Sequence, residues 1–197
     1  MAMGMSFPGW EARQRQRKQA ALLHLLGSSV GGATVGAFLG ALGGAIGLGA
    51  VRSILLAAVV AYTAPRALVA VRRGRAVRGY GLQRQVPRRL RVGVSAGYFL
   101  WGSMLGAGIL TVVPYGSFLV LLTAQAGSGV ALAAASGALF GLGREGPTLL
   151  TLAGRQDIST LSELLRTMMR PAQRLNLLLI VVGGGLLTGL SAVARLY

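Results

Sequence analysis

The sequence predicts an all-α fold, a polytopic integral membrane bundle of about five transmembrane helices. Apolar residues make up 53% of the 197-residue chain, and the mean hydropathy is +0.63. Charged residues make up only 12%, about half the usual share in a soluble domain. Apolar runs of about 20 residues, the length at which an α-helix crosses a bilayer, recur along the chain. So few charges could not cover this much apolar surface in water.

Charge and hydropathy divide the chain into six segments. They are a basic tail at residues 1–19, a first transmembrane hairpin at 20–71, an arginine-rich loop at 72–92, a second hairpin with broken helices at 93–153, a loop with an amphipathic helix at 154–174, and a last helix at 175–197. The individual spans are expected at about 20–46, 53–71, 93–124, 130–152 and 175–193.

The basic residues gather between the spans, and the formal net charge is +16. The tail holds four of the 20, the 72–92 loop eight and the 154–174 loop four. Because loops rich in arginine and lysine stay on the cytoplasmic side, we expect a multi-pass protein of the cell membrane with its N-terminus in the cytoplasm and its C-terminus outside. The apolar run after the basic tail is too long for a secretory signal, so we expect it to be retained as an anchor.

The arginine-rich loop has two alternative partners. Eight arginines in about 20 residues would attract the phosphates of a nucleic acid, yet Tyr80 is the only aromatic residue among them. The predicted topology already accounts for the charge. We therefore expect contact with anionic lipid headgroups and no nucleic acid.

Side chains suited to catalysis are scarce. The chain has no cysteine and a single histidine, His24, which excludes thiol chemistry and provides no cluster of metal ligands. The four acidic residues form no carboxylate pair, and no Ser/His/acid set is present. We expect no enzyme activity, no metal and no cofactor, and we interpret His24 as a packed or headgroup-level histidine.

The 154–174 loop contains the segment DISTLSELLRTMMRP. Thr160 and Glu163 have the spacing of a capping box at a helix start. The apolar residues that follow occupy one helix face: Leu161, Leu164, Leu165, Met168 and Met169. We expect an amphipathic helix that ends at Pro171 and either lies in the membrane interface or docks on a partner.

Small residues recur at every fourth position of the first span: Ser28, Gly32, Gly36, Gly40 and Gly44. Such a stripe lets a second helix approach backbone to backbone, which is how helices associate in lipid. The second helix is expected to come from the same bundle. The alternative is a homo-oligomer or a partner in a membrane complex.

The stretch FGLGREGPTLL at 140–150 places two opposite charges in an apolar region. Its Gly-x-Gly-x-x-Gly pattern lacks the preceding strand that a dinucleotide site requires. Four residues predict a helix break: Gly141, Gly143, Gly146 and Pro147. Arg144 and Glu145 either mark the cytoplasmic end of a shorter span, or belong to a polar break that lines a pathway for a solute or ion, where they would pair across helices or face a hydrated cavity.

Pro114 predicts a second break, midway along the third span. A proline frees a backbone carbonyl, which nearby hydroxyl groups can satisfy. Thr111, Tyr115 and Ser117 surround it in the sequence. We expect a kinked helix and place these four residues with the charged pair as candidate pathway residues.

From Gly102 onward, GAGILTVVPYGSFLVLLTAQAGSGVALAAASGALFGLGREGPTLLTLAG and LNLLLIVVGGGLLTGLSAVARLY resemble the second half of the CcdA/DsbD-type membrane proteins of cytochrome c biogenesis. GGATVGAFLGALGGAIG and RSILLAAVVAYTAPRALVAV resemble the second and third helices of that family's first repeat. The resemblance implies two inverted three-helix repeats. The family's electron carriers have a Pro-Cys motif where this chain has Pro114 and Tyr115, and the first helix of the first repeat is missing. The thiol relay is therefore not implied.

These observations favour a transport unit, or a membrane subunit, for a small solute or ion without thiol redox chemistry. The alternative is a structural or assembly protein that binds partner subunits through glycine-rich helix faces. An enzyme acting on lipid would need a nucleophile or metal site, and the sequence offers neither.

Overall fold

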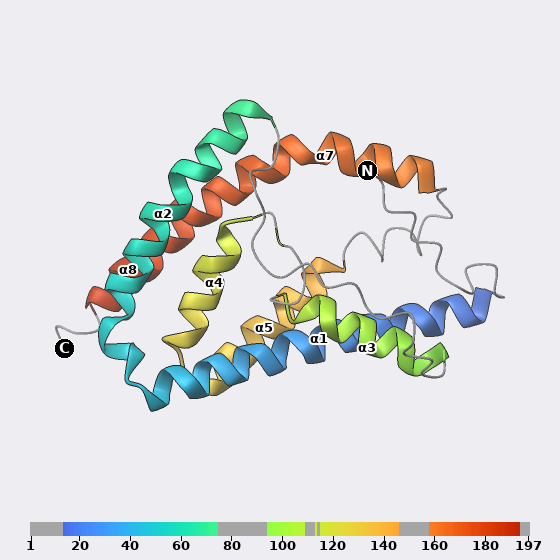
Figure 1. Ribbon diagram of the computed structural model, residues 1–197, viewed down its shortest axis with the longest axis horizontal. Coiled ribbons are helices and arrows are strands. Elements are labelled where there is room, and N and C mark those ends of the chain that lie inside the picture. The colour runs from blue at the N-terminus through green and yellow to red at the C-terminus, as the bar shows by residue number, and fades with distance from the viewer. Residues whose placement is uncertain (1–13, 75–93, 109–112, 114, 146–157, 194–197) are drawn as a thin grey trace.

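The computed structural model describes residues 14–74, 94–108, 113, 115–145 and 158–193, and the regular elements in these ranges are helices (Figure 1). In chain order they are α1 (Gln14–Ala45), the 3-10 helix η1 (Leu48–Val51), α2 (Arg52–Arg73), α3 (Val94–Gly106), α4 (Ser117–Ala126), α5 (Val130–Arg144), α7 (Ile158–Leu178), the π-helical turn η2 (Leu179–Gly183) and α8 (Gly184–Val193).

Three helical stretches in the described ranges are long and apolar enough to cross a membrane. They are Gln19–Ala45, Leu48–Arg73 and Arg166–Leu190, which match the first, second and last predicted spans. The helices α4 and α5 are apolar but shorter. Phe38, Leu139 and Leu190 are each more than 60% exposed, as large apolar side chains are where a protein faces lipid.

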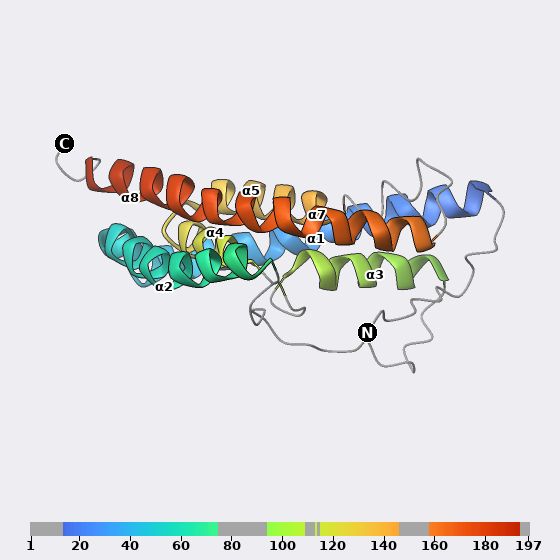
Figure 2. The same ribbon diagram turned by 90° about the horizontal axis from the view of Figure 1, so that it is seen from above.

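The helices form two groups, and α4 lies between them (Figure 1). In the first group α3 and α5 pack along α1, on opposite sides of it in the view of Figure 2. In the second group α2 packs against α7, η2 and α8. Because α4 contacts α1, α2 and α5, it connects the two groups.

The contact between α1 and α5 is close enough to require glycine. A Cβ atom on Gly32 would lie within 3.0 Å of the carbonyl oxygen of Gly137, and one on Gly36 within 3.0 Å of that of Ala133. Since residue numbers rise along α1 as they fall along α5, the two helices are antiparallel. The stripe of small residues on α1 therefore meets a stripe on α5 with the same spacing.

The helix α3 runs parallel to α1 and packs as tightly. A Cβ atom on Gly31 would meet the backbone of Ser103, and one on Gly102 of α3 would meet the carbonyl group of His24. The middle of α1 thus has backbone of α3 on one side and of α5 on another.

The apolar core of the second group is formed by residues of α2 and η2 together with one residue of α4. Leu56 and Ala67 of α2, Val120 of α4 and Ile180 of η2 are buried together. Here α2 and the α7–η2–α8 path are antiparallel, since Gly74 approaches Arg170 while Gly184 approaches Val60.

The third predicted span is divided in the structure. The helix α3 ends at Gly106, and α4 begins at Ser117, so the expected kinked helix over 93–124 was wrong. Gly108 has a φ of +69°, a left-handed conformation that ends a helix. The ring of Phe118 occupies the space that a Cβ atom on Gly108 would need, 2.7 Å away.

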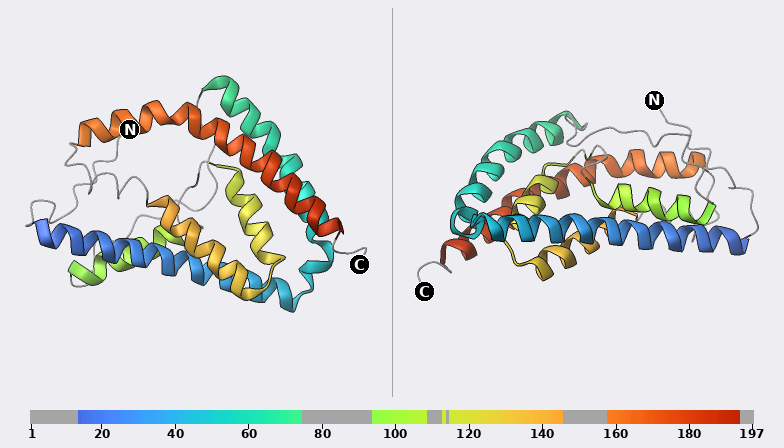
Figure 3. Two further views of the ribbon diagram at one scale, coloured as in Figure 1. Left: turned by 180° about the vertical axis from the view of Figure 1, so that it is seen from behind. Right: turned by 60° about the horizontal axis from the view of Figure 1, so that its bottom comes forward.

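Two other predicted boundaries also differ. The helix α5 ends at Arg144, whereas the fourth span was expected to reach residue 152. Pro171 was expected to end the amphipathic helix, yet α7 runs through it and follows one path with η2 and α8 (Figure 3). Since α7 begins at Ile158, Thr160 lies inside the helix and not at its N-cap.

Candidate functional site

A histidine and a glutamate form a buried pair between α1 and the end of α5. His24 Nε2 lies 2.9 Å from Glu145 Oε2. His24 is 5% exposed and Glu145 2% exposed. His24 lies five residues inside the candidate span that begins at Gln19, about 7–8 Å along the helix axis. The pair is therefore inside the apolar bundle rather than on its surface.

The third member of the site is a backbone carbonyl of α3. His24 Nδ1 lies 3.2 Å from the carbonyl oxygen of Tyr98. A carbonyl oxygen only accepts hydrogen bonds, so Nδ1 is the donor in this contact. The imidazole ring is thus held at both nitrogens, by Tyr98 on one side and by Glu145 on the other.

Ser28, one turn after His24, fixes the distance between α1 and α5. Its Oγ donates to the carbonyl oxygen of Gly141 at 2.8 Å. The amide of Glu145 bonds instead to the carbonyl oxygen of Leu142. Ser28 therefore satisfies one of the carbonyl groups that the end of a helix leaves open.

The register of α1 against α5 brings His24 and Glu145 together. Ser28 faces Gly141 and Gly32 faces Gly137, so four residues forward on α1 match four residues back on α5. Four residues before Ser28 on α1 is His24, and four residues after Gly141, just past the end of α5, is Glu145. The same glycine spacing that sets the close contact also aligns the two ionisable side chains.

Arg144 stands beside the pair without joining it. Its side chain is half-buried, and the charge of Glu145 acts on it. In the described part of the chain its buried Nη1 atom has no hydrogen-bond partner. Glu145 thus makes its close contact across helices with His24, while Arg144 acts on it through charge.

Other candidate residues lie elsewhere. Ser117 begins α4, and its N–H donates to Asn176 Oδ1 of α7 at 3.0 Å. Tyr115, half-buried, precedes it, and its carbonyl oxygen accepts from the Phe118 N–H. Thr111 and Pro114 lie outside the described residues. The structure thus assigns Ser117 to a contact with α7 and Glu145 to a contact with α1.

The glycines predicted for helix packing and for the helix break also differ in their surroundings. Gly40 packs against Val130 and Ala133, whereas a Cβ atom on Gly44 would have nothing within 4 Å. Gly141 is buried and Gly143 is exposed. Gly146 and Pro147 lie outside the described residues.

A second buried polar group lies on α7, three residues before Asn176. Gln173 is 1% exposed, and within the described structure neither atom of its amide has a hydrogen-bond partner. Asn176 and Ile180 on the same helix face contact the start of α4 through Ser117 and Gly116. An uncharged amide does not bind a proton or a metal ion strongly, so this group is secondary to the His24–Glu145 pair.

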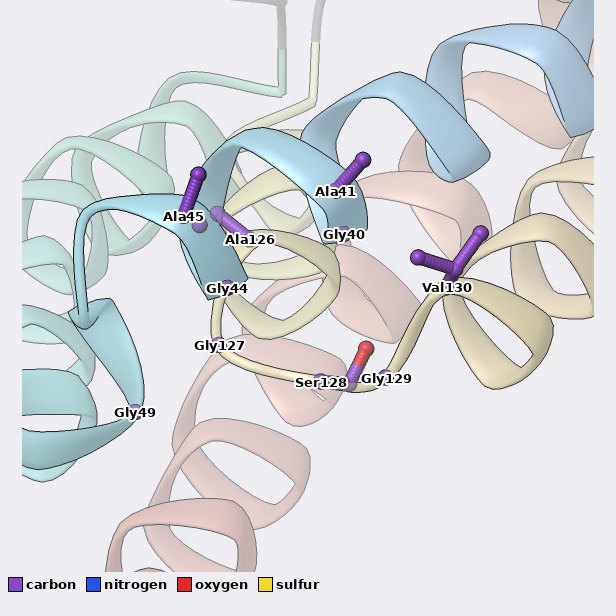
Figure 4. A pocket seen from close by; sticks show the side chains of 11 residues that line it. Gly40, Ala41, Gly44, Ala45, Gly49, Ala126, Gly127, Ser128, Gly129 and Val130 are labelled. Atoms are coloured by element: carbon purple, nitrogen blue, oxygen red, sulfur yellow. The ribbon is translucent and has the colours of Figure 1, made fainter.

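A cavity of about 350 Å³ lies at the opposite end of α1, beside the turn from α4 to α5 (Figure 4). Glycine, alanine and valine line it, and Ser128 is its only polar side chain. The Ser128 Oγ donates to the carbonyl oxygen of Gln125. The cavity therefore has no side chain left for chemistry.

No group of three metal-ligating side chains occurs among the residues that the structure describes. No protein-family model, curated protein or solved structure matches the chain. The CcdA/DsbD resemblance therefore stays a prediction that rests on sequence pattern alone.

The sequence interpretation underestimated His24. A signal was nevertheless present, because His24 continues the every-fourth series of Ser28 and Gly32 by one step towards the N-terminus. Glu145 likewise continues the series of Gly137 and Gly141 on α5. Two stripes of small residues that each end in an ionisable residue predict a pair once the antiparallel contact is known.

Proposed function

We propose that the protein is a transport unit, or the membrane subunit of one, for a small solute or ion. The observation that supports this function is the buried His24–Glu145 pair. Replacing a buried ion pair with apolar residues is often neutral or stabilising, so stability alone gives no reason for one here. Ionisable residues inside membrane bundles are characteristic of ion and solute pathways.

The proposed topology places the N-terminus and the arginine-rich loop in the cytoplasm and the C-terminus outside. The parallel contact of α1 with α3 and the antiparallel contact of α1 with α5 support alternating directions. Arg73, Arg170 and Arg174 are exposed at one end of the second group, where they would meet anionic headgroups. Because the chain has no cysteine, single cysteines at Arg73 and Gly129 test this topology. The account requires an impermeant thiol reagent to label Gly129→Cys, and not Arg73→Cys, in intact cells.

Flux measurements in reconstituted vesicles test the proposed transport. Glu145→Gln should abolish the flux while the protein still elutes as a single folded species in detergent. Glu163→Gln is the matched control, because Glu163 makes an exposed pair with Arg166 at 3.7 Å. Flux that is the same in all three proteins would rule out a pathway through the pair.

An assembly role is the second candidate, and the last helix supports it. A Cβ atom on Gly185 or Gly189 of α8 would have nothing within 4 Å, and Leu186 beside them is exposed. By contrast, Gly32 and Gly36 already pack against α5. A partner subunit that co-purifies in gentle detergent, and is lost from Gly185→Leu, would favour assembly; a lone monomer would favour transport.

A further inference from the structure

We propose that the ion handled by this protein is the proton, and that His24 and Glu145 together form its binding site. The proposal deepens the transport function above and rests on it for its physiological role. Proton binding itself can be tested without transport.

The contacts of His24 determine how many protons the pair holds. The Tyr98 carbonyl oxygen requires a hydrogen on Nδ1. A hydrogen bond between Nε2 and Glu145 Oε2 at 2.9 Å then contains one more proton. That proton lies either on nitrogen, giving imidazolium and carboxylate, or on oxygen, giving imidazole and carboxylic acid. Both forms have zero net charge, so the pair accommodates the bridging proton without adding charge to the bundle.

Release of the bridging proton leaves two acceptors face to face. The lone pair of Nε2 and the carboxylate of Glu145 repel each other at this distance, and the pair carries a net charge of −1. The guanidinium of Arg144, which the Glu145 charge already influences, compensates that charge. Release and uptake therefore change the pair between a neutral form and a form of charge −1 that Arg144 compensates.

Addition of a second proton is disfavoured. The pair would then be an imidazolium beside a carboxylic acid, with a net charge of +1 next to Arg144. Around the pair, α3 contributes one titratable residue, Tyr98, and the described side chains of α1 contribute no charged residue besides His24. The site thus exchanges one proton, and its neighbours oppose a second.

The single histidine makes the test direct. In protein labelled with ¹⁵N-histidine and held in lipid nanodiscs, every imidazole signal comes from His24. We expect Nδ1 to stay protonated, while the Nε2 signal changes from that of a nitrogen sharing the bridging proton to that of an unprotonated nitrogen without it as the pH is raised. The carboxyl stretching band of Glu145, followed by infrared difference spectroscopy, should change over the same pH range, because one proton is shared.

Glu145→Gln should remove the infrared band and uncouple the change at Nε2, whereas Glu163→Gln should leave both unchanged. An unprotonated Nδ1, an Nε2 signal that is constant from about pH 4 to pH 10, or a change that Glu145→Gln leaves untouched would each overturn the proposal. These measurements need only folded protein and do not depend on flux.

Vesicles with a trapped pH-sensitive dye separate the proton site from the transport function. Acidification driven by a pH gradient, present in wild type and absent in Glu145→Gln, supports both. A coupled titration without acidification would keep the proton site and refute transport. Transport of another solute without any titration of His24 would keep transport and refute the proton site.

Discussion

Gly32→Ala adds one methyl group at the closest part of the contact between α1 and α5. The new Cβ atom would lie within 3.0 Å of the carbonyl oxygen of Gly137, whereas ordinary contacts begin at 3.4 Å. The carbonyl oxygen of Gly106 is 3.3 Å away on another side. All of these atoms belong to backbone, so no side chain can rotate away, and a whole helix has to move.

The expected cost follows from two opposing effects. Overpacking costs about 1–3 kcal/mol, and we expect the upper end because backbone must shift. Alanine in place of glycine returns about 1 kcal/mol in a helix. The net loss is about 2 kcal/mol, or a fall of about 4–8 °C in Tm for a chain of this size.

Gly44→Ala is the matched control on the same helix. Its Cβ atom would have nothing within 4 Å, so only the helix propensity acts and stability should rise by up to about 1 kcal/mol. Thermal unfolding in detergent, followed by circular dichroism, compares the two variants. Equal stability of Gly32→Ala and Gly44→Ala would refute the close antiparallel contact.

Three further substitutions test other contacts, each by the same unfolding assay. Gln173→Leu should raise stability by about 1–3 kcal/mol, because it removes buried polar atoms that lack partners; a loss of stability would mean that the amide is satisfied. Asn176→Leu should lower stability by about 1–3 kcal/mol, since the Ser117 N–H loses its acceptor; a variant as stable as wild type would contradict this contact. Ser28→Ala should cost about 1 kcal/mol through the lost bond to Gly141, and no change would show that this bond is weak.

Hydropathy predicted the membrane class and three of the five expected spans, because span length and low charge depend on local composition. The division of the third span was missed. Its apolar run is continuous in composition, and the break depends on the left-handed backbone at Gly108 and on the ring of Phe118 packed above it. That ring also stacks on Phe140 of α5 at 5.1 Å. Contacts of this kind between distant segments leave no local signal.

Only one residue of the buried pair, Glu145, was predicted from the sequence as a site residue. Glu145 was recognised as an ionisable residue in an apolar region, with pairing across helices as one alternative beside the end of a span and a hydrated cavity. Its partner His24 was interpreted as packed or headgroup-level, because no sequence period shows which helix lies opposite. The antiparallel register of α1 and α5 supplies that information, and it arises from the fit of two glycine faces.

A double-mutant cycle on His24 and Glu145 tests the central contact most directly. His24→Leu and Glu145→Leu should each destabilise the protein strongly, since each leaves one buried partner alone. The double variant should then lose less than the sum of the two, with a coupling energy of at least about 1 kcal/mol. Losses that add to within about 0.5 kcal/mol would contradict the account, because the two side chains would then not be in contact.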